Sequence, residues 1–342
     1  MTSGFILIGE NIHTTRAIRK SSPRIVENEA GETSIAFTDE HGAQRLLPIP
    51  DEELRTQEYE EGRVKHVRSA VRLARAGEEV GVAYLRKLAF EQIDNGAAFL
   101  DVNVDEYSHR LPEQIQTMQY LVGLLGPISS VPLSIDSSNE EIIAAGIEAA
   151  DAHAGSPMLN SASLERIEAL DLAQSVGGPV IVTAAGASGM PSNTEERVEN
   201  ASRMVDHALA KGITLDLIYV DPLMFPIAVD GSFATHVLDA IRAIRSTYGP
   251  EIHITGGMSN VSFGLPNRRL INDAFLTLAI QAGADSGIVD PVQNDIERVK
   301  AIDPSTPAFQ LALDVLSGAD RNCRAYIRAS RAGELDTTSG VH

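Results

Sequence analysis

The sequence lacks several features that define common classes of protein. Its 342 residues include one cysteine, Cys323, and no tryptophan. A single cysteine excludes an intramolecular disulfide and any metal or iron–sulfur site that needs several thiolates. Basic residues are also scarce, because 28 lysines and arginines stand against 47 aspartates and glutamates, a formal net charge of −19. We therefore expect no broad nucleic-acid surface, since such a surface requires a basic face.

Long apolar runs are absent as well. The start, MTSGFILIGEN, has no basic segment and only a short apolar run. No apolar stretch approaches the roughly 20 residues that span a bilayer. We expect no membrane association and, with a single cysteine, a cytoplasmic location. With 43% hydrophobic and 22% charged residues, the composition is that of a globular chain.

Short β-branched runs alternate with helical patterns along the chain. Between the runs, apolar residues recur at helical spacing, as over 140–150, 195–212 and 235–249. This alternation predicts parallel strands with helical crossovers. Eight such units favour an α/β fold of the (β/α)8 TIM-barrel type over a doubly wound sheet, for which a GxGxxG motif would follow the first strand. The predicted strands are 5–11, 99–104, 132–136, 157–161, 179–185, 216–222, 253–260 and 286–291.

The gap between the first two predicted strands is much wider than any later gap. Most of the excess lies in 14–62, which we interpret as an insertion in the loop after the first strand, with a possible hairpin over 33–50. Such an insertion could be a lid at the barrel mouth, or a decorative or oligomer-forming loop. We interpret residues 1–342 as a single domain that ends in C-terminal helices and a tail over 307–342.

Each predicted strand ends on polar residues. A barrel brings these ends to one mouth, where the active sites of this fold lie. At any single position, capping of the next helix explains an Asp or Asn equally well. All eight strands end this way, and buried polar groups cost several kcal/mol each unless they are paired, so the pattern favours a polar pocket. The residues are Glu10, Asn11, Asp101, Asn103, Asp136, Asn160, Thr183, Asp221, Ser259, Asn260 and Asp290.

Carboxylates and carboxamides dominate this set. The sequence has no cysteine nucleophile motif, Gly-x-Ser-x-Gly elbow or Walker loop. Because His13, His109 and His153 are scattered rather than spaced as ligands, we predict no metal site. Carboxylates and amides suit hydrogen bonding to a planar heterocycle, and a carboxylate grips an amino-pyrimidinone edge through paired N–H donors.

Six motifs follow one another along the predicted strands: IGEN (8–11), FLDVNV (99–104), LSIDSSN (133–139), MLNSAS (158–163), YVDPLMFP (219–226) and GGMSNVSFGLPNRRLIN (256–272). They resemble those of the pterin-binding barrel family, and within it the methyltetrahydrofolate:corrinoid-protein methyltransferases. This resemblance implies an enzyme that moves a methyl group between N5 of tetrahydrofolate and the cobalt of a corrinoid, or cobalamin, on a separate protein. It implies tetrahydrofolate or 5-methyltetrahydrofolate as substrate, and a homodimer.

The resemblance also implies roles for individual residues. Asp136, Asn160 and Asp221 would hydrogen-bond the pterin ring, and Asn260 would reach the N5 side; Asn260, Asp221 and Asp136 are the expected catalytic residues. Because N5 is a poor leaving group, the reaction needs a proton or a strengthening hydrogen bond there. A buried network with the aspartates could relay that proton. The other expected pocket residues are Glu10, Asn11, Asp101, Asn103, Gly257, Ser259 and Arg268.

The chain departs from the family pattern in two places. The run Phe263-Gly264-Leu265-Pro266 stands where the family usually has polar residues, and 14–62 is not part of the compact methyltransferase pattern. One alternative is a dihydropteroate-synthase-like enzyme, although Asp-Val-Asn-Val-Asp replaces its Gly-Gly-Glu-Ser-type strand end. Another is a non-catalytic pterin-binding subunit of a corrinoid complex. DAHAGS (151–156) lacks the spacing of a cobalamin-binding motif, so we expect the corrinoid on another chain.

Overall fold

A computed structural model describes residues 4–335 of the chain. Its main sheet contains eight strands: β1 (Ile6–His13), β7 (Ala97–Asn103), β8 (Leu133–Asp136), β9 (Met158–Ala162), β10 (Val180–Thr183), β11 (Ile218–Asp221), β12 (His253–Ile254) and β13 (Ser286–Val289). Their order across the sheet is β12-β11-β10-β9-β8-β7-β1-β13. Adjacent strands pair in parallel, as β7 does with β8 and β10 with β11. A parallel bridge from Gly257 to Ile288 joins the segment after β12 to β13. The predicted (β/α)8 TIM-barrel fold is confirmed.

The predicted strands begin within two residues of the observed ones, but the seventh is wrong in length. We predicted a strand over 253–260, whereas β12 spans two residues and a 3-10 helix, η3 (Met258–Ser262), follows it. The strand is shorter because Gly256 has a φ of +149°, a backbone conformation that residues with a Cβ rarely adopt. The regular strand therefore ends before Gly256, and the expected Ser-Asn-Val-Ser motif lies on a short helix.

Helices connect the strands as the periodicity predicts. The helices predicted over 140–150, 195–212 and 235–249 are present, with ends that differ by two residues at most. Asn139 and Asn193 begin two of them, because each side-chain oxygen accepts a bond from a backbone N–H of the first turn. After two four-residue helices, α1 (Asp51–Leu54) and α2 (Gln57–Glu60), the helices are α3 (His66–Arg75), α4 (Glu79–Asp94), α5 (Leu111–Leu125), α6 (Glu140–Ala149), α7 (Ala169–Val176), α8 (Thr194–Ala210), α9 (Phe233–Tyr248), α10 (Arg268–Ala282), α11 (Ile296–Lys300), α12 (Pro307–Leu316) and α13 (Arg324–Arg331).

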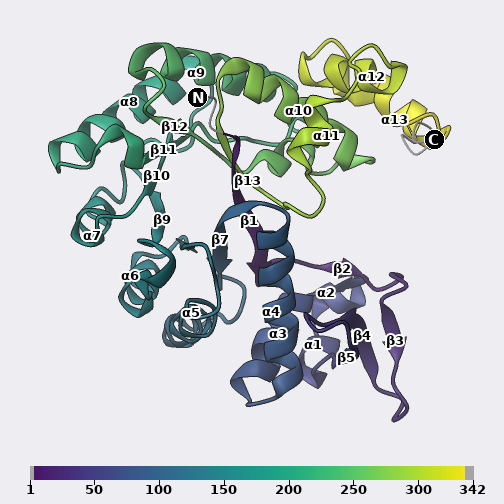
Figure 1. Cartoon of the computed structure of the whole chain (residues 1–342). Coiled ribbons are helices and arrows are strands. Elements are labelled where there is room, and N and C mark those ends of the chain that lie inside the picture. Colours follow the sequence, from purple (N-terminus) through teal and green to yellow (C-terminus); the bar gives the residue numbers. More distant parts are fainter. Residues whose placement is uncertain (1–3, 336–342) are drawn as a thin grey trace. The chain divides into compact units, whose positions relative to one another are not determined.

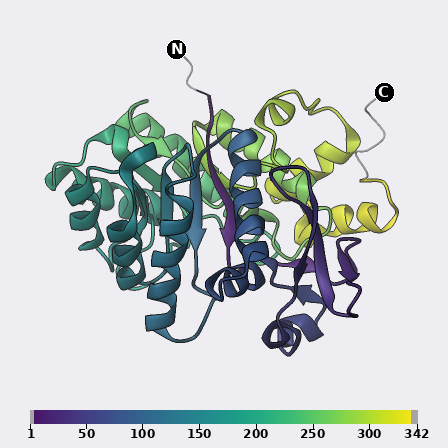
Figure 2. The same ribbon diagram turned by 60° about the horizontal axis from the view of Figure 1, so that its bottom comes forward.

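The chain divides into two compact units. The N-terminal unit comprises 8–160 and 290–292, and the C-terminal unit comprises the described residues of 1–7, 161–289 and 293–342. In the N-terminal unit β1 lies beside β7, with α4 alongside (Figure 2). In the C-terminal unit all four residues of β10 are buried, as expected for a strand covered on both faces. The single domain that we predicted over 1–342 remains a prediction, and the end of its tail lies outside the described residues.

Residues 14–62 form small elements within the N-terminal unit. The predicted hairpin is present as β4 (Thr33–Thr38) and β5 (Gln44–Pro48), with Ile35 opposite Leu47. A third strand, β3 (Ile25–Glu27), pairs with β4. The Phe37 ring packs edge-on against Tyr84 of α4, with their centroids 5.0 Å apart, and Figure 1 shows these strands beside α3 and α4. An apolar core thus ties the segment to the rest of its unit.

A buried ion pair fixes the same segment to α3. Glu53 lies in α1 (Asp51–Leu54) and is only 2% exposed. Both of its oxygens accept bonds from Arg68 Nε, at 2.8 and 2.9 Å, and Oε1 also accepts one from Arg72 Nε at 2.7 Å. Removing one partner from such a group leaves an uncompensated buried charge, which is strongly destabilising. That 14–62 is an insertion, whether lid or decoration, remains a prediction.

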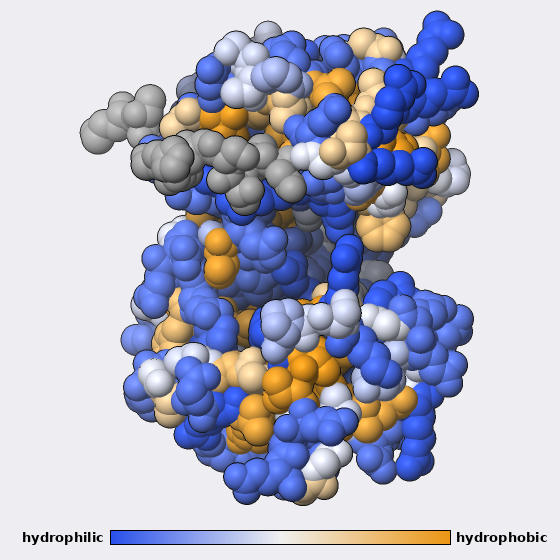
Figure 3. Space-filling model, turned by 90° about the vertical axis from the view of Figure 1, so that its right-hand side faces the viewer, coloured by the Kyte–Doolittle hydropathy of each residue, from blue (hydrophilic) through white to orange (hydrophobic). Residues whose placement is uncertain are grey.

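Within the described part of the chain, no helix is long and apolar enough to cross a membrane. The face of the molecule in Figure 3 is mainly hydrophilic, with hydrophobic residues gathered in patches. The expected location and the expected absence of nucleic-acid and membrane partners remain predictions.

The packing of α6 on β8 makes a testable prediction at Gly146. An added Cβ there would lie 2.5 Å from Ile135 Cγ2 and 2.9 Å from Met118 Cγ. We therefore expect Gly146→Ala to lower the free energy of unfolding by about 1–3 kcal/mol, measured by urea denaturation. Gly123 in α5 is the matched control, since nothing lies within 4 Å of its added Cβ. Gly123→Ala should be neutral or stabilising, and equal stability of the two variants would contradict this packing.

Candidate active site

In the N-terminal unit, β7, β8 and β9 bring four predicted site residues together. The register places Asn103 beside Asp136, and Asp136 beside Asn160. Asn103 Nδ2 donates to Asp136 Oδ2 at 2.8 Å, and Asn160 Nδ2 lies 3.3 Å from Asp101 Oδ1. Asp101 is fully buried. Each of the two carboxylates is therefore held by a carboxamide, which leaves Asp136 Oδ1 as a further acceptor in this group.

His13 joins this group from β1 and was not among the predicted site residues. Its Nε2 lies 2.7 Å from Asp101 Oδ2. Burial lowers the pKa of His13, but the hydrogen bond and charge of Asp101, with the charges of Asp136 and Glu10, outweigh burial and leave the pKa raised. We ended the first strand at Asn11, whereas β1 continues to His13. Residues two apart in a strand share a face, so the period-two pattern could have revealed His13.

Asp136 is a carboxyl group of this cluster with a displaced pKa. Burial raises its pKa to about 7, and the negative charge of Asp101 acts in the same direction. The positive charge of His13 and the hydrogen bond from Asn103 oppose that shift. Near neutral pH, Asp136 can therefore either accept hydrogen bonds as a carboxylate or hold a proton.

A second group surrounds Glu10 and Asn11 of β1. Arg16 donates to Glu10 Oε1 at 3.0 Å and to Asp290 Oδ2 at 2.8 Å. Asn11 Nδ2 donates to Asp290 Oδ1 at 2.9 Å, and the backbone N–H of Asn11 donates to Gln92 Oε1 at 2.8 Å. The buried Asn11 Oδ1 has no hydrogen-bond partner among the described residues, so it can accept a bond from a ligand. Sequence reasoning missed Arg16 and Gln92, since both follow patterns typical of exposed loops and helices.

The ligand atoms of His13, Asp101 and Asp136 lie within 4.8 Å of one another, a spacing that raises the question of a metal ion. Two protein ligands about 2.1 Å from one tetrahedral ion lie roughly 3.4 Å apart. The 2.7 Å between His13 Nε2 and Asp101 Oδ2 is instead the length of a charge-assisted hydrogen bond. The geometry thus fits a proton between these two groups better than an ion. That the chain binds no metal remains a prediction.

In the C-terminal unit, Asp221 ends β11, as predicted. Its Oδ1 accepts the backbone N–H of Leu223 at 2.7 Å, and Leu223 adopts a positive φ of 64°. Burial raises the pKa of Asp221 to about 6, while that N–H and the charge of Arg197 oppose the shift. A Cβ at Gly256 would lie 2.8 Å from Asp221 Oδ1, so only glycine lets the neighbouring segment pass this close.

Arg197 of α8 is a further residue that sequence reasoning missed. It is fully buried, it donates to the Asn193 carbonyl at 2.9 Å, and its guanidinium lies 5.2 Å from the centre of the Phe225 ring. The fixed positive charge favours ionisation of Asp221. In the sequence, Arg197 sits among the charged residues of an amphipathic helix, where arginine usually faces solvent.

The remaining predicted residues lie on or beside η3. A Cβ at Gly257 would lie 2.8 Å from Asn260 Nδ2, which explains the glycine before Met258. Arg268 donates to the Ser259 carbonyl at 2.8 Å and to Ser262 Oγ at 2.9 Å. Arg268 therefore holds the backbone of the segment that carries Asn260. Each unit thus brings its own predicted residues together, and their catalytic and pterin-binding roles remain predictions.

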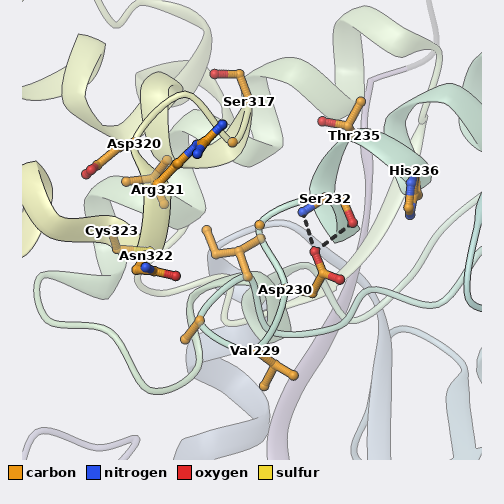
Figure 4. Close-up of a pocket in the computed structure, with 15 residues that line it drawn as sticks. Val229, Asp230, Ser232, Thr235, His236, Ser317, Asp320, Arg321, Asn322 and Cys323 are labelled. Atoms are coloured by element: carbon orange, nitrogen blue, oxygen red, sulfur yellow. Dashed lines mark hydrogen bonds between the residues drawn. The ribbon is translucent and has the colours of Figure 1, made fainter.

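A cavity of about 460 Å³ lies in the C-terminal unit, lined by 227–232, Thr235, His236, Val315, 317–318 and 320–323. Figure 4 shows Asp230 hydrogen-bonded to Ser232, with Arg321 and Cys323 to their left. None of the predicted site residues lines this cavity.

Comparisons with known proteins bear on the family. Residues 58–290 match the family model described as "Pterin binding enzyme". The methylcorrinoid:tetrahydrofolate methyltransferase of Eubacterium limosum is 32% identical over 268 residues, which cover 76% of this chain and 92% of that protein. The methionine synthase of Mycobacterium leprae is 29% identical over 59% of this chain, although the match covers only 17% of that longer protein.

Among solved structures, the dihydropteroate synthase of Stenotrophomonas maltophilia superposes with a TM-score of 0.50. The match covers 65% of this chain and 85% of that one, at 20% identity. An identity this low supports the barrel fold and nothing finer. The family-model match and the extended identity to the Eubacterium limosum protein support the family predicted from the motifs, and the chain belongs to the pterin-binding enzyme family.

Proposed function

We propose that the chain is a methyltransferase that moves a methyl group between N5 of tetrahydrofolate and the cobalt of a corrinoid on a separate protein. The observation that carries the proposal is the 32% identity to a methylcorrinoid:tetrahydrofolate methyltransferase over 92% of that protein. The polar groups at the strand ends support it, since they offer carboxylates and carboxamides suited to a pterin edge.

Asp136 and Asn160 in the N-terminal unit, and Asp221 in the C-terminal unit, are the proposed pterin ligands. An ionised carboxylate can accept two parallel N–H bonds from an amino-pyrimidinone edge. Burial raises the pKa of Asp136 to about 7 and that of Asp221 to about 6. N–H donors of a bound pterin favour the ionised form of each carboxyl group. Asn11 Oδ1, buried and without a protein partner, is a further acceptor.

The methyl step needs control of charge at N5. In transfer toward cobalt, the N5–methyl bond breaks, its electron pair stays on N5, and N5 takes a proton. The methyl group bonds to the cobalt(I) nucleophile, which becomes methylcobalt(III). The reverse reaction runs through the same transition state. Asn260 is proposed to stabilise N5 by a hydrogen bond that strengthens as the bond breaks. Arg268, which donates to the Ser259 carbonyl, would keep the Asn260 segment in place.

The corrinoid protein is proposed to contact the loops that follow β11 and β12. Phe263 lies three residues after Asn260 and is 64% exposed, and Val229 is 77% exposed. The two loops touch, because the Ile227 N–H donates to the Val261 carbonyl at 3.1 Å. Exposed apolar side chains beside the segment that would face the methyl group suit a protein partner.

The test of the proposal is methyl transfer in both directions with candidate corrinoid proteins, followed through the cobalamin absorption spectrum. We expect Asn260→Ala to lower turnover by about 10²-fold, because a transition-state hydrogen bond is lost, and to leave tetrahydrofolate binding intact. Asp136→Ala should mainly weaken binding. A wild-type chain that binds tetrahydrofolate tightly but transfers no methyl in either direction refutes catalysis. Unchanged turnover in Asn260→Ala refutes the N5 contact.

Asp221→Asn tests what this half-buried acid does to stability. Because burial raises the folded-state pKa from 3.8 to about 6, the ionised form opposes folding, so stability is lost as pH rises through this window. Asparagine keeps an oxygen for the Leu223 N–H but cannot ionise. At about pH 8 we expect the variant to be more stable by on the order of 1 kcal/mol, since partial exposure screens the charge. Urea denaturation at about pH 4 should show no such gain, and a variant less stable than wild type at both pH values contradicts this account.

Phe263→Ala tests the contact with the corrinoid protein. Truncating an exposed aromatic in an interface should lower kcat/KM for the corrinoid protein by roughly 10-fold and leave tetrahydrofolate affinity unchanged. Leu209→Ala is the control, because Leu209 is also an exposed apolar residue, 41% accessible, but lies in α8. Equal kinetics for the two variants would place the partner elsewhere.

A further inference from the structure

His13 stands where two acids of the N-terminal unit come together. Its Nε2 lies 2.7 Å from Asp101 Oδ2, and the ligand atoms of His13, Asp101 and Asp136 all lie within 4.8 Å of one another. Asp101 Oδ1 lies 3.3 Å from Asn160 Nδ2, and Asp136 Oδ2 accepts Asn103 Nδ2. The imidazole thus contacts Asp101 directly and faces Asp136.

Two carboxylates this close do not both ionise readily without a positive charge beside them. His13 is the group in contact that can supply one. Two other acids face the cluster, and each already has hydrogen-bond or ion-pair partners. Asp105 accepts hydrogen bonds from Ser137 and Ser138, and Glu10 is paired with an arginine at 3.0 Å. Protonation of His13 therefore determines whether a positive charge lies beside the carboxylates of Asp101 and Asp136.

We propose that His13 is a positioning residue that, as an imidazolium bonded to Asp101, keeps Asp136 ionised for the N–H groups of the pterin. The inference rests on the proposed function, because it takes the ligand to be a pterin. The positive charge offsets the repulsion between the two acids, so it favours the form of Asp136 that presents two acceptor oxygens over the carboxylic acid. His13 touches Asp101 and acts on the ligand through Asp136.

The sign of the effect follows from the charges. Burial and Asp101 raise the pKa of Asp136, and His13 lowers it. Without His13, Asp136 would hold its proton to higher pH and would lose an acceptor for the pterin. Affinity would then fall in the neutral range and return once the pH is high enough to ionise Asp136. A residue with only a packing role would lower affinity by the same factor at every pH.

The experiment measures tetrahydrofolate binding by the full chain under anaerobic conditions across about pH 5 to 9. We expect His13→Asn to move the midpoint of the acid limb upward by about one pH unit or more. His153→Asn is the control, since His153 is an exposed histidine of the same unit, and its profile should match wild type. An unmoved midpoint in His13→Asn overturns the inference, whether or not the overall affinity falls.

A second readout needs no ligand. The imidazole resonance of His13, identified as the one absent from His13→Asn, should titrate above the usual range of histidine. Asp101→Asn removes the neighbouring charge, so we expect that titration to move to lower pH. A His13 resonance that titrates alike in wild type and Asp101→Asn overturns the pairing.

The outcomes separate the two proposals. A wild-type chain that binds no tetrahydrofolate at any pH refutes the proposed function, and the His13 titration still decides whether the pair exists. Binding with an unshifted profile in His13→Asn refutes only the role of His13. If a chelator abolished tetrahydrofolate binding by the wild-type chain, a metal ion held by His13, Asp101 and Asp136 would explain the cluster instead of a shared proton. An unchanged pH profile in the presence of chelator supports the shared proton.

Discussion

At the strand ends, hydrogen-bond donors hold a buried acid, Asp101, and two half-buried acids, Asp136 and Asp221. A buried carboxylate is costly unless a charge or hydrogen bonds compensate it. Asp101 has His13 and Asn160, and Asp136 has Asn103. Asp221 has the Leu223 N–H in the other unit. The donors to Asp101 and Asp136 come from other strands of the sheet, and the donor to Asp221 comes from the turn after its own strand.

Close backbone approach is the second requirement of this arrangement. A Cβ at Gly9 would lie 2.5 Å from Gln92 Oε1, the atom that accepts the Asn11 N–H. A Cβ at Gly256 would likewise lie 2.8 Å from Asp221 Oδ1. Each glycine lets a polar side chain lie against the backbone of the next strand or loop. The glycines of IGEN and GGMSN therefore serve to seat the polar groups as well as to turn the chain.

Much of the fold and part of the site follow from local patterns. Apolar runs and turn signals predict where strands begin, and polar strand ends such as Asp136 and Asp221 stand out because they interrupt apolar sequence. Other features depend on tertiary contacts. His13 follows the expected end of its strand, and Arg197 matches a solvent-facing helix position although it is fully buried. The predicted length of the seventh strand was wrong because Gly256 adopts a φ of +149° beside the carboxylate of Asp221, and no local pattern encodes that contact.

The raised pKa values of Asp136 and Asp221 make ligand binding depend on pH. Burial raises the pKa of Asp136 to about 7 and that of Asp221 to about 6, so near neutral pH a fraction of the chains carries a proton on these groups. A ligand that donates N–H bonds favours the carboxylate and lowers both pKa values. Binding then releases protons, and its affinity rises with pH across this window by linkage. When these acids are ionised without a ligand, they oppose folding. The N–H donors of a bound ligand stabilise the ionised form, so ligand binding is coupled to the stability of the strand ends.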